Sequence, residues 1–157
     1  MTDCKTLSRS EKAKNYFLQG YNCTQAVSLA FADELPVDSE TLLKIASSFG
    51  GGMGRLREVC GAVSGMFIVM GLISGYATPE TGLVKTEHYR NIQELAHRFE
   101  QKNGNIVCRE LLGLKQNRQD ATPEPRTREY YEKRPCPDLV ASAAAILEEY
   151  IQEQKGT

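Results

Sequence analysis

The sequence lacks several features that would indicate a familiar function. It contains no Cys-x-x-Cys pair, which argues against a zinc finger or a thioredoxin-type motif, and no Cys-x-x-Cys-His, so covalent c-type haem is not expected. The 157 residues carry a formal net charge of -1, with no basic block, so nucleic acid is not an expected partner. No pair of carboxylates and no serine–histidine arrangement indicates hydrolytic chemistry.

Signals for export or membrane insertion are also missing. Residues 1–10 are polar and lack the apolar core of a signal peptide. One strongly apolar stretch, residues 60–77, is diluted by four glycines, so we expect a buried helix rather than a membrane span. The count of five cysteines is odd, which disfavours an exported, disulfide-stapled protein. We therefore expect a cytoplasmic protein.

Helical patterns dominate what is present, and no strand pair stands out. The length suits one domain, for which we expect an all-α, compact bundle of six to seven helices around a central apolar, glycine-rich helix. Residues 1–7 are expected to be a disordered tail and residues 114–135 a long irregular connection. Amphipathic spacing and capping residues predict helices over residues 8–19, 22–31, 38–49, 60–74, 79–102, 106–112 and 137–152.

Four widely spaced cysteines, Cys23, Cys60, Cys108 and Cys136, are the main functional signal. They are 37, 48 and 28 residues apart, so only the fold can assemble a shared site. Each falls at or near the predicted start of a helix, where free amides and partial positive charge favour the thiolate. The thiolate is both the nucleophile of disulfide exchange and a metal ligand. Cys4 lies in the polar N-terminal segment and is expected to be incidental.

Four glycines occur within residues 50–54, directly before the second of these cysteines. Such a run disfavours a helix and permits positive φ angles and close backbone approach. It predicts either a flexible turn or a loop whose amides face a ligand or a cysteine sulfur. The candidate cofactor-binding residues are therefore Gly51, Gly52, Gly54 and Arg55.

One histidine falls in line with the buried stripe predicted for the helix over residues 79–102. The apolar members of that stripe are Val84, Ile92, Leu95 and Phe99. His88 is most simply a core residue with a hydrogen-bond partner. The alternative is a proton-transfer partner or an extra metal ligand near the thiols.

Other polar residues have two interpretations each. Arg55 and Arg57 precede Cys60 and either lower the pKa of its thiol or lie on the surface as solvated charges. Tyr130 and Tyr131, in the long polar connection, either cover a pocket or anchor the chain.

The order of these features resembles a known family. Gly20-Tyr21-Asn22-Cys23 is followed by the glycine run, then by Cys60-Gly61-Ala62-Val63-Ser64-Gly65, and then by two single cysteines. This order is similar to that of the suspected redox-active proteins named for the pattern C_GCAxxG_C_C, over about residues 10–151. The resemblance implies a helical domain with a redox role, and it implies that Cys23, Cys60, Cys108 and Cys136 are its four characteristic cysteines. It implies no particular reaction.

Three hypotheses follow. In the first, the four cysteines carry out thiol–disulfide exchange or electron transfer with a redox partner protein or a small thiol, which would make the protein a thiol–disulfide oxidoreductase. Cys60, beside the small residues Gly61 and Ala62, would then be the most accessible thiol.

In the second hypothesis the same four thiolates, with His88 as a possible extra ligand, bind zinc or an iron–sulfur cluster. In the third, the cysteines are core residues of a non-enzymatic helical module. The face formed by Gly61 and Gly65 then serves close helix packing or a homodimer.

Overall fold

Helices build the molecule. The computed structural model describes residues 6–79, 82–115 and 118–156, so Cys4 and most of the expected tail lie outside the described residues. No strand occurs in these ranges apart from one isolated antiparallel bridge between Val59 and Val107, which confirms the predicted all-α class. The α-helices are α1 (Arg9–Leu18), α2 (Cys23–Leu29), α3 (Ser39–Ala46), α4 (Gly50–Met53), α5 (Gly61–Ser74), α6 (Leu83–Asn103), α7 (Cys108–Leu111), α8 (Arg128–Lys133) and α9 (Cys136–Lys155). Of these, α1, α2, α3 and α8 begin at side-chain caps.

Local capping explains where the first helices begin. Asn22 accepts a hydrogen bond from the amide of Gln25, and the Gln25 side chain accepts one from the Asn22 amide, which completes the predicted capping box. Ser8 and Glu11 form the same arrangement at α1, and Asp38 caps α3. The cap at Asn22 makes the next residue, a cysteine, the first residue of α2.

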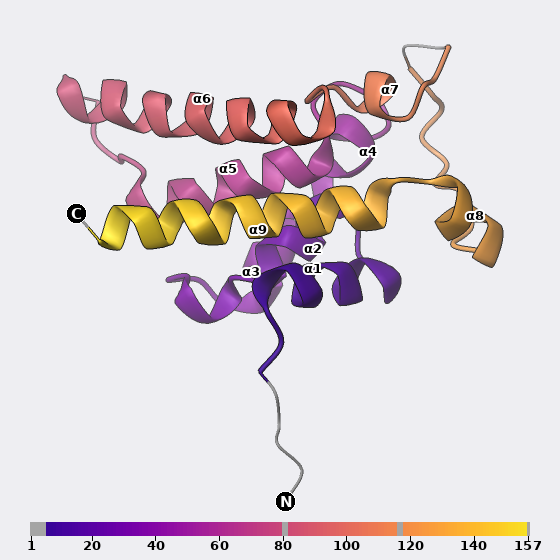
Figure 1. Cartoon of the computed structure of the whole chain (residues 1–157), viewed down its shortest axis with the longest axis horizontal. Coiled ribbons are helices and arrows are strands. Elements are labelled where there is room, and N and C mark those ends of the chain that lie inside the picture. Colours follow the sequence, from indigo (N-terminus) through magenta and orange to yellow (C-terminus); the bar gives the residue numbers. More distant parts are fainter. Residues whose placement is uncertain (1–5, 80–81, 116–117, 157) are drawn as a thin grey trace, which may run out of the picture.

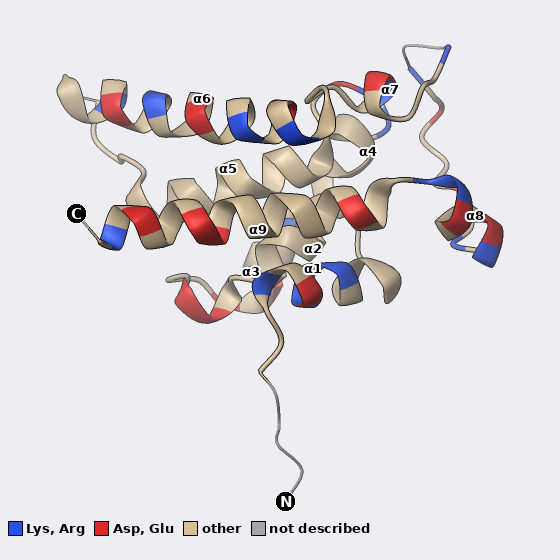
Figure 2. Ribbon diagram, in the orientation of Figure 1, with Lys and Arg blue, Asp and Glu red and all other residues tan. Residues whose placement is uncertain are grey.

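The apolar helix α5 packs against α2, α6 and α9 (Figure 1). It carries no charged side chain, unlike the neighbouring α6 and α9 (Figure 2). Its buried residues are Gly61, Ala62, Val63, Ser64, Gly65, Met66, Val69 and Met70. Burial on this scale supplies much of the hydrophobic stabilisation of the fold.

Two glycines of α5 allow its close contact with α2. A Cβ on Gly65 would lie 2.8 Å from the Cβ of Val27, and a Cβ on Gly61 would lie 2.9 Å from the Cβ of Cys23. Thr24 also donates a hydrogen bond of 2.8 Å from its hydroxyl to the Gly61 carbonyl. The absence of side chains at this glycine pair therefore lets α2 approach α5 closely.

The first turns of α6 differ from the prediction. Val84 is 54% exposed rather than buried, whereas Leu95 and Phe99 are fully buried as predicted. The start of α6 extends beyond the end of α5 (Figure 1), and its apolar residues Leu83 and Val84 are exposed there.

The stretch predicted as an irregular connection contains the short helix α8. Thr127 caps it by accepting a hydrogen bond of 3.2 Å from the amide of Tyr130. In the described part of the chain, no helix combines the length and hydropathy that crossing a bilayer requires.

Candidate functional site

The four cysteines of the family pattern line one small cavity. Cys23, Cys108 and Cys136 are the first residues of α2, α7 and α9, and Cys60 is the N-cap residue of α5. The cavity has a volume of about 50 Å³. Its other lining residues are Asn22, Gly51, Gly52, Arg57, Gly61, Leu111, Leu112, Arg126, Tyr130 and Leu139.

A short backbone pairing brings two of the cysteines together from distant parts of the chain. The amide of Cys60 donates to the Ile106 carbonyl at 2.7 Å, and the amide of Cys108 donates to the Glu58 carbonyl. The Arg109 amide donates to the Arg57 carbonyl at 3.2 Å. This ladder places the starts of α5 and α7 side by side, and the sequence contains no local signal for it.

The glycine run forms a left-handed turn against the cavity. Gly51, Gly52, Met53 and Gly54 have φ angles of 68°, 69°, 69° and 66°, and the Gly54 amide donates to the Gly50 carbonyl at 2.9 Å. Left-handed backbone is favourable only for glycine, which explains the composition of the run. Met53 has the same left-handed backbone although it is not a glycine. Residues with strained backbones of this kind are concentrated at functional sites.

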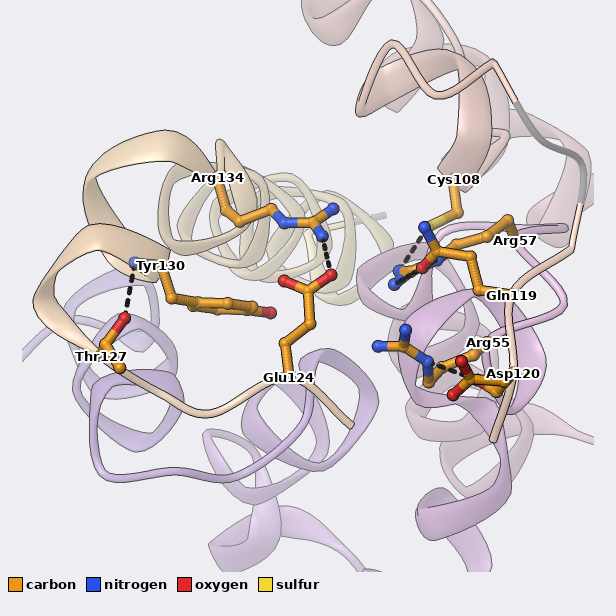
Figure 3. Close-up of polar contacts among 9 residues, drawn as sticks. All are labelled: Arg55, Arg57, Cys108, Gln119, Asp120, Glu124, Thr127, Tyr130 and Arg134. Carbon is orange, nitrogen blue, oxygen red and sulfur yellow. Dashed lines mark hydrogen bonds and ion pairs between the residues drawn. The ribbon is translucent and has the colours of Figure 1, made fainter. Parts of the chain in front are cut away.

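The candidate cofactor-binding residues divide into two pairs. Gly51 and Gly52 line the cavity, whereas Gly54 and Arg55 are not among its lining residues. Arg55 instead donates from Nε to the Asp120 carbonyl at 2.7 Å, which ties the 114–135 connection to the turn (Figure 3).

Cys23 and Cys136 share a hydrogen bond that separates their pKa values. The bond lowers the pKa of the Cys136 thiol, and nearby Arg134, Arg57 and Arg126 lower it further against the effect of burial. The same bond, together with burial, raises the pKa of Cys23 well above its usual range. Of the two thiols, Cys136 therefore ionises more readily and Cys23 keeps its proton to higher pH.

The other two thiols are held in the neutral form. Burial raises the pKa of Cys60 to about 12, although the amides of Ala62 and Val63 act in the opposite direction. Burial also raises the pKa of Cys108, against the effect of a hydrogen bond of 3.5 Å from Arg57 Nη1 to its sulfur. Cys60 is only 5% exposed, so the prediction that it is the most accessible thiol is wrong; Cys23 is the least buried of the four.

Arg57 is a buried cation without a carboxylate partner. The residue is 6% exposed, and its Nε and Nη2 donate to Gln119 Oε1 at 3.0 and 2.7 Å (Figure 3). No carboxylate of the described ranges forms an ion pair with it. The interpretation of Arg57 as a solvated surface charge is therefore wrong, and its partner thiol is Cys108 rather than Cys60.

The connection before α9 supplies further polar residues that the sequence did not single out. Arg126 lines the cavity with Tyr130, and Arg134 forms an ion pair of 2.6 Å with Glu124 (Figure 3). The arginines at 126 and 134 lie over the Tyr130 ring at 5.0 and 5.6 Å. Of the two tyrosines proposed to cover a pocket, Tyr130 lines the cysteine cavity and Tyr131 lines a separate surface pocket beside Pro135.

His88 does not join the cysteines. Its ring packs edge-on against Tyr76, 5.9 Å between centroids, and it is not among the cavity-lining residues. Across the described ranges, no three His, Cys, Asp or Glu side chains are arranged to hold a metal ion. In this arrangement the four thiols do not fit a tetrahedral zinc or a cluster, and a metal site stays a prediction that elemental analysis of anaerobically purified protein checks.

Comparison with known proteins gives one family match. A family model described as "Putative redox-active protein (C_GCAxxG_C_C)" matches residues 21–150, which include all four cavity cysteines. The chain has Cys60-Gly61-Ala62 where the pattern in the family's name reads Gly-Cys-Ala, and it keeps the Ala-x-x-Gly spacing at Ala62 and Gly65. No curated protein and no solved structure matches the chain. The family model covers most of the sequence, and the chain belongs to the C_GCAxxG_C_C family.

Proposed function

We propose that Cys23 and Cys136 are the redox pair of a thiol–disulfide exchange site, with Cys136 as the attacking thiolate. The position of the two thiols carries this proposal, because both line the same cavity and their interaction moves their pKa values in opposite directions. A thiol with a lowered pKa is the effective nucleophile at neutral pH. Cys23 is then the resolving cysteine.

The exchange takes place in two balanced steps. The Cys136 thiolate attacks one sulfur of a substrate disulfide, which forms a mixed disulfide and releases the first substrate thiolate. Cys136 no longer accepts the hydrogen bond, so Cys23 loses the interaction that raises its pKa most, and its proton passes to the departing thiolate. The Cys23 thiolate then attacks Cys136 Sγ, which forms the intramolecular disulfide and releases the second substrate thiolate.

Turnover needs a reductant, for which we propose an external thiol or a redox partner protein. It donates two electrons and two protons overall and restores both cysteines. In the cytoplasm, the compartment expected from the sequence, such reductants keep the pair reduced. Cys60 and Cys108 take no part in these steps and remain protonated at neutral pH, as their raised pKa values require.

The test is oxidation of reduced protein by 2-hydroxyethyl disulfide, in a Cys4→Ser background that removes the thiol outside the family pattern. We expect the parent protein to lose two thiols and peptide mapping to find the Cys23–Cys136 disulfide. Cys23→Ala should stop at a mixed disulfide on Cys136, and Cys136→Ala should lose no thiol rapidly. Cys60→Ala is the matched control and should behave as the parent does. Mapping of a different pair, or unchanged oxidation of Cys136→Ala, contradicts the proposal.

A further inference from the structure

The cavity beside Cys136 has more positive than negative charge. Arg57 and Arg126 line it, and Arg134 is close enough to lower the pKa of Cys136. Within the described part of the chain, the carboxylate that forms an ion pair with one of these arginines is Glu124, bound to Arg134. Even with Cys136 ionised, one of the three positive charges has no negative partner. A partly buried cation without a counter-ion is costly, so the site is suited to a second anion.

Neutral groups hold the two lining arginines in place without a ligand. Arg126 donates from Nη1 to the Phe17 carbonyl and from Nη2 to the Tyr21 carbonyl, each at 3.1 Å, and its guanidinium lies 4.1 Å from the Phe17 ring centroid. Arg57 is held by Gln119 and by the sulfur of Cys108. These contacts fix the guanidinium groups but leave their charge unneutralised. Charges fixed in this way favour an anion without further rearrangement.

The size of the cavity limits what enters it. A volume of about 50 Å³ is well below the roughly 300–1,000 Å³ of a pocket that takes a drug-sized ligand. The backbone of Gly51 and Gly52 forms part of the wall, and the ring of Tyr130 forms another part. A cavity of this size suits a single small end group.

We propose that the cavity binds the anionic end group of a low-molecular-weight disulfide, with Arg57 and Arg126 as the anion-binding residues. This inference rests on the proposed function, because Cys136 is the atom that attacks the neighbouring sulfur of the bound molecule. The bond changes are those of the exchange described above. The thiolate that leaves is itself an anion, and the same arginines stabilise it until the Cys23 proton reaches it.

The first test compares three disulfides of matched length that differ in charge. They are 3,3'-dithiodipropionate (anionic), 2-hydroxyethyl disulfide (neutral) and cystamine (cationic), each normalised to its reaction with a free monothiol. We expect the protein to prefer the anionic over the cationic reagent at least tenfold at low ionic strength, with the preference shrinking as salt is added. Equal normalised rates overturn the inference.

Variants assign the effect to the cavity. Arg126→Gln should reduce the anionic-to-cationic ratio several-fold, and this ratio is independent of the thiolate fraction of Cys136. Arg126→Lys should keep most of the ratio. Arg128→Gln is the matched control, since that side chain is 93% exposed and pairs with Glu132 on the surface. If Arg128→Gln lowers the ratio as much as Arg126→Gln does, the anion site is not in the cavity.

A second measurement separates this inference from the proposed function. Sulfate does not react with thiols, so it tests anion binding alone. Millimolar sulfate should raise the unfolding temperature of the protein, compared with chloride of equal ionic strength, and should not do so for Arg126→Gln. If no disulfide oxidises the protein but sulfate has this effect, the exchange reaction fails and the anion site stands. If disulfides react without charge preference and sulfate has no effect, the anion site fails and the exchange stands.

Discussion

Gly52 packs directly on Cys108, because a Cβ built at Gly52 would lie 2.6 Å from the Cβ of Cys108. The same atom would lie 2.8 Å from the Cα of Arg57 and 2.9 Å from the amide nitrogen of Glu58. The carbonyl groups of Arg57 and Glu58 belong to the pairing that places α7 beside α5, and the Glu58 amide donates to the Gly52 carbonyl at 3.0 Å. A side chain at position 52 therefore has to displace the ladder or the cysteine.

We expect Gly52→Ala to destabilise the protein more than Gly54→Ala. Both glycines are left-handed, with φ of 69° and 66°, so both substitutions cost about 1–2 kcal/mol in backbone strain. A Cβ on Gly54 meets nothing closer than the Ser48 carbonyl oxygen at 3.8 Å, whereas that on Gly52 adds an overpacking cost of about 1–3 kcal/mol. Urea denaturation measures the difference. Equal losses for the two variants would show that the contact with Cys108 is not limiting.

Alanine substitutions at two glycines of α5 should change the free energy of unfolding in opposite directions. Gly61→Ala places a Cβ 2.9 Å from both the Cβ of Cys23 and the hydroxyl oxygen of Thr24, and we expect a loss of about 1–3 kcal/mol as α2 is pushed away. Gly71 lies in the same helix with no atom within 4 Å of its Cβ position. Gly71→Ala should therefore gain about 0.5–1 kcal/mol from reduced backbone entropy in the unfolded chain. A stability gain in both variants would contradict this account of the α2–α5 contact.

Local signals in the sequence were sufficient to place the starts of α1, α2 and α3. Asn22 and Gln25 interact within one turn, so the position of Cys23 at the start of α2 follows from three neighbouring residues. The spacing of Gly61 and Gly65 marks a helix face that can approach another helix closely, and that face does meet α2. Each of these features depends on residues at most four positions apart.

The chemistry of the cavity depends on contacts between distant residues, which the sequence could not indicate. Arg57 is buried because a ladder joins its strand-like segment to residues 106–109, and its charge then reaches Cys108, 51 positions away. Arg126 lines the site because carbonyl groups of Phe17 and Tyr21 hold it, more than 100 positions away. Contacts with residues distant in the sequence, such as Ile106, also bury Cys60. Its neighbours in the sequence, Gly61 and Ala62, gave no sign of these contacts, so its thiol was expected to be accessible.

The buried Cys60 thiol should make stability depend on alkaline pH. Its pKa is raised from 9.0 to about 12, so the unfolded chain ionises above pH 9 while the folded protein resists. The stability contribution of the neutral thiol is full below pH 9 and is lost progressively between pH 9 and 12. At pH 10.5 the loss is about 2 kcal/mol relative to a variant that cannot ionise. The free energy of unfolding of the wild type should therefore fall, relative to that of Cys60→Ala, between pH 7.5 and 10.5. A difference that stays constant with pH would contradict the raised pKa.

The thiolate character of Cys136 should appear as an acid-shifted alkylation profile. Its pKa lies below 9.0 because Cys23 donates a hydrogen bond to it, so ionisation of Cys136 begins at lower pH than that of an ordinary thiol. Iodoacetamide labelling of Cys136, followed by mass spectrometry between pH 5 and 10, should give a midpoint below that of a free cysteine peptide. Cys23→Ala removes the donor and should move the midpoint to higher pH, whereas Cys60→Ala removes a thiol that does not bond to Cys136 and should leave it unchanged. A midpoint that does not respond to Cys23→Ala would mean that the arginines alone stabilise the thiolate. Cys23 could then still resolve the mixed disulfide, but it would not be the residue that activates the nucleophile.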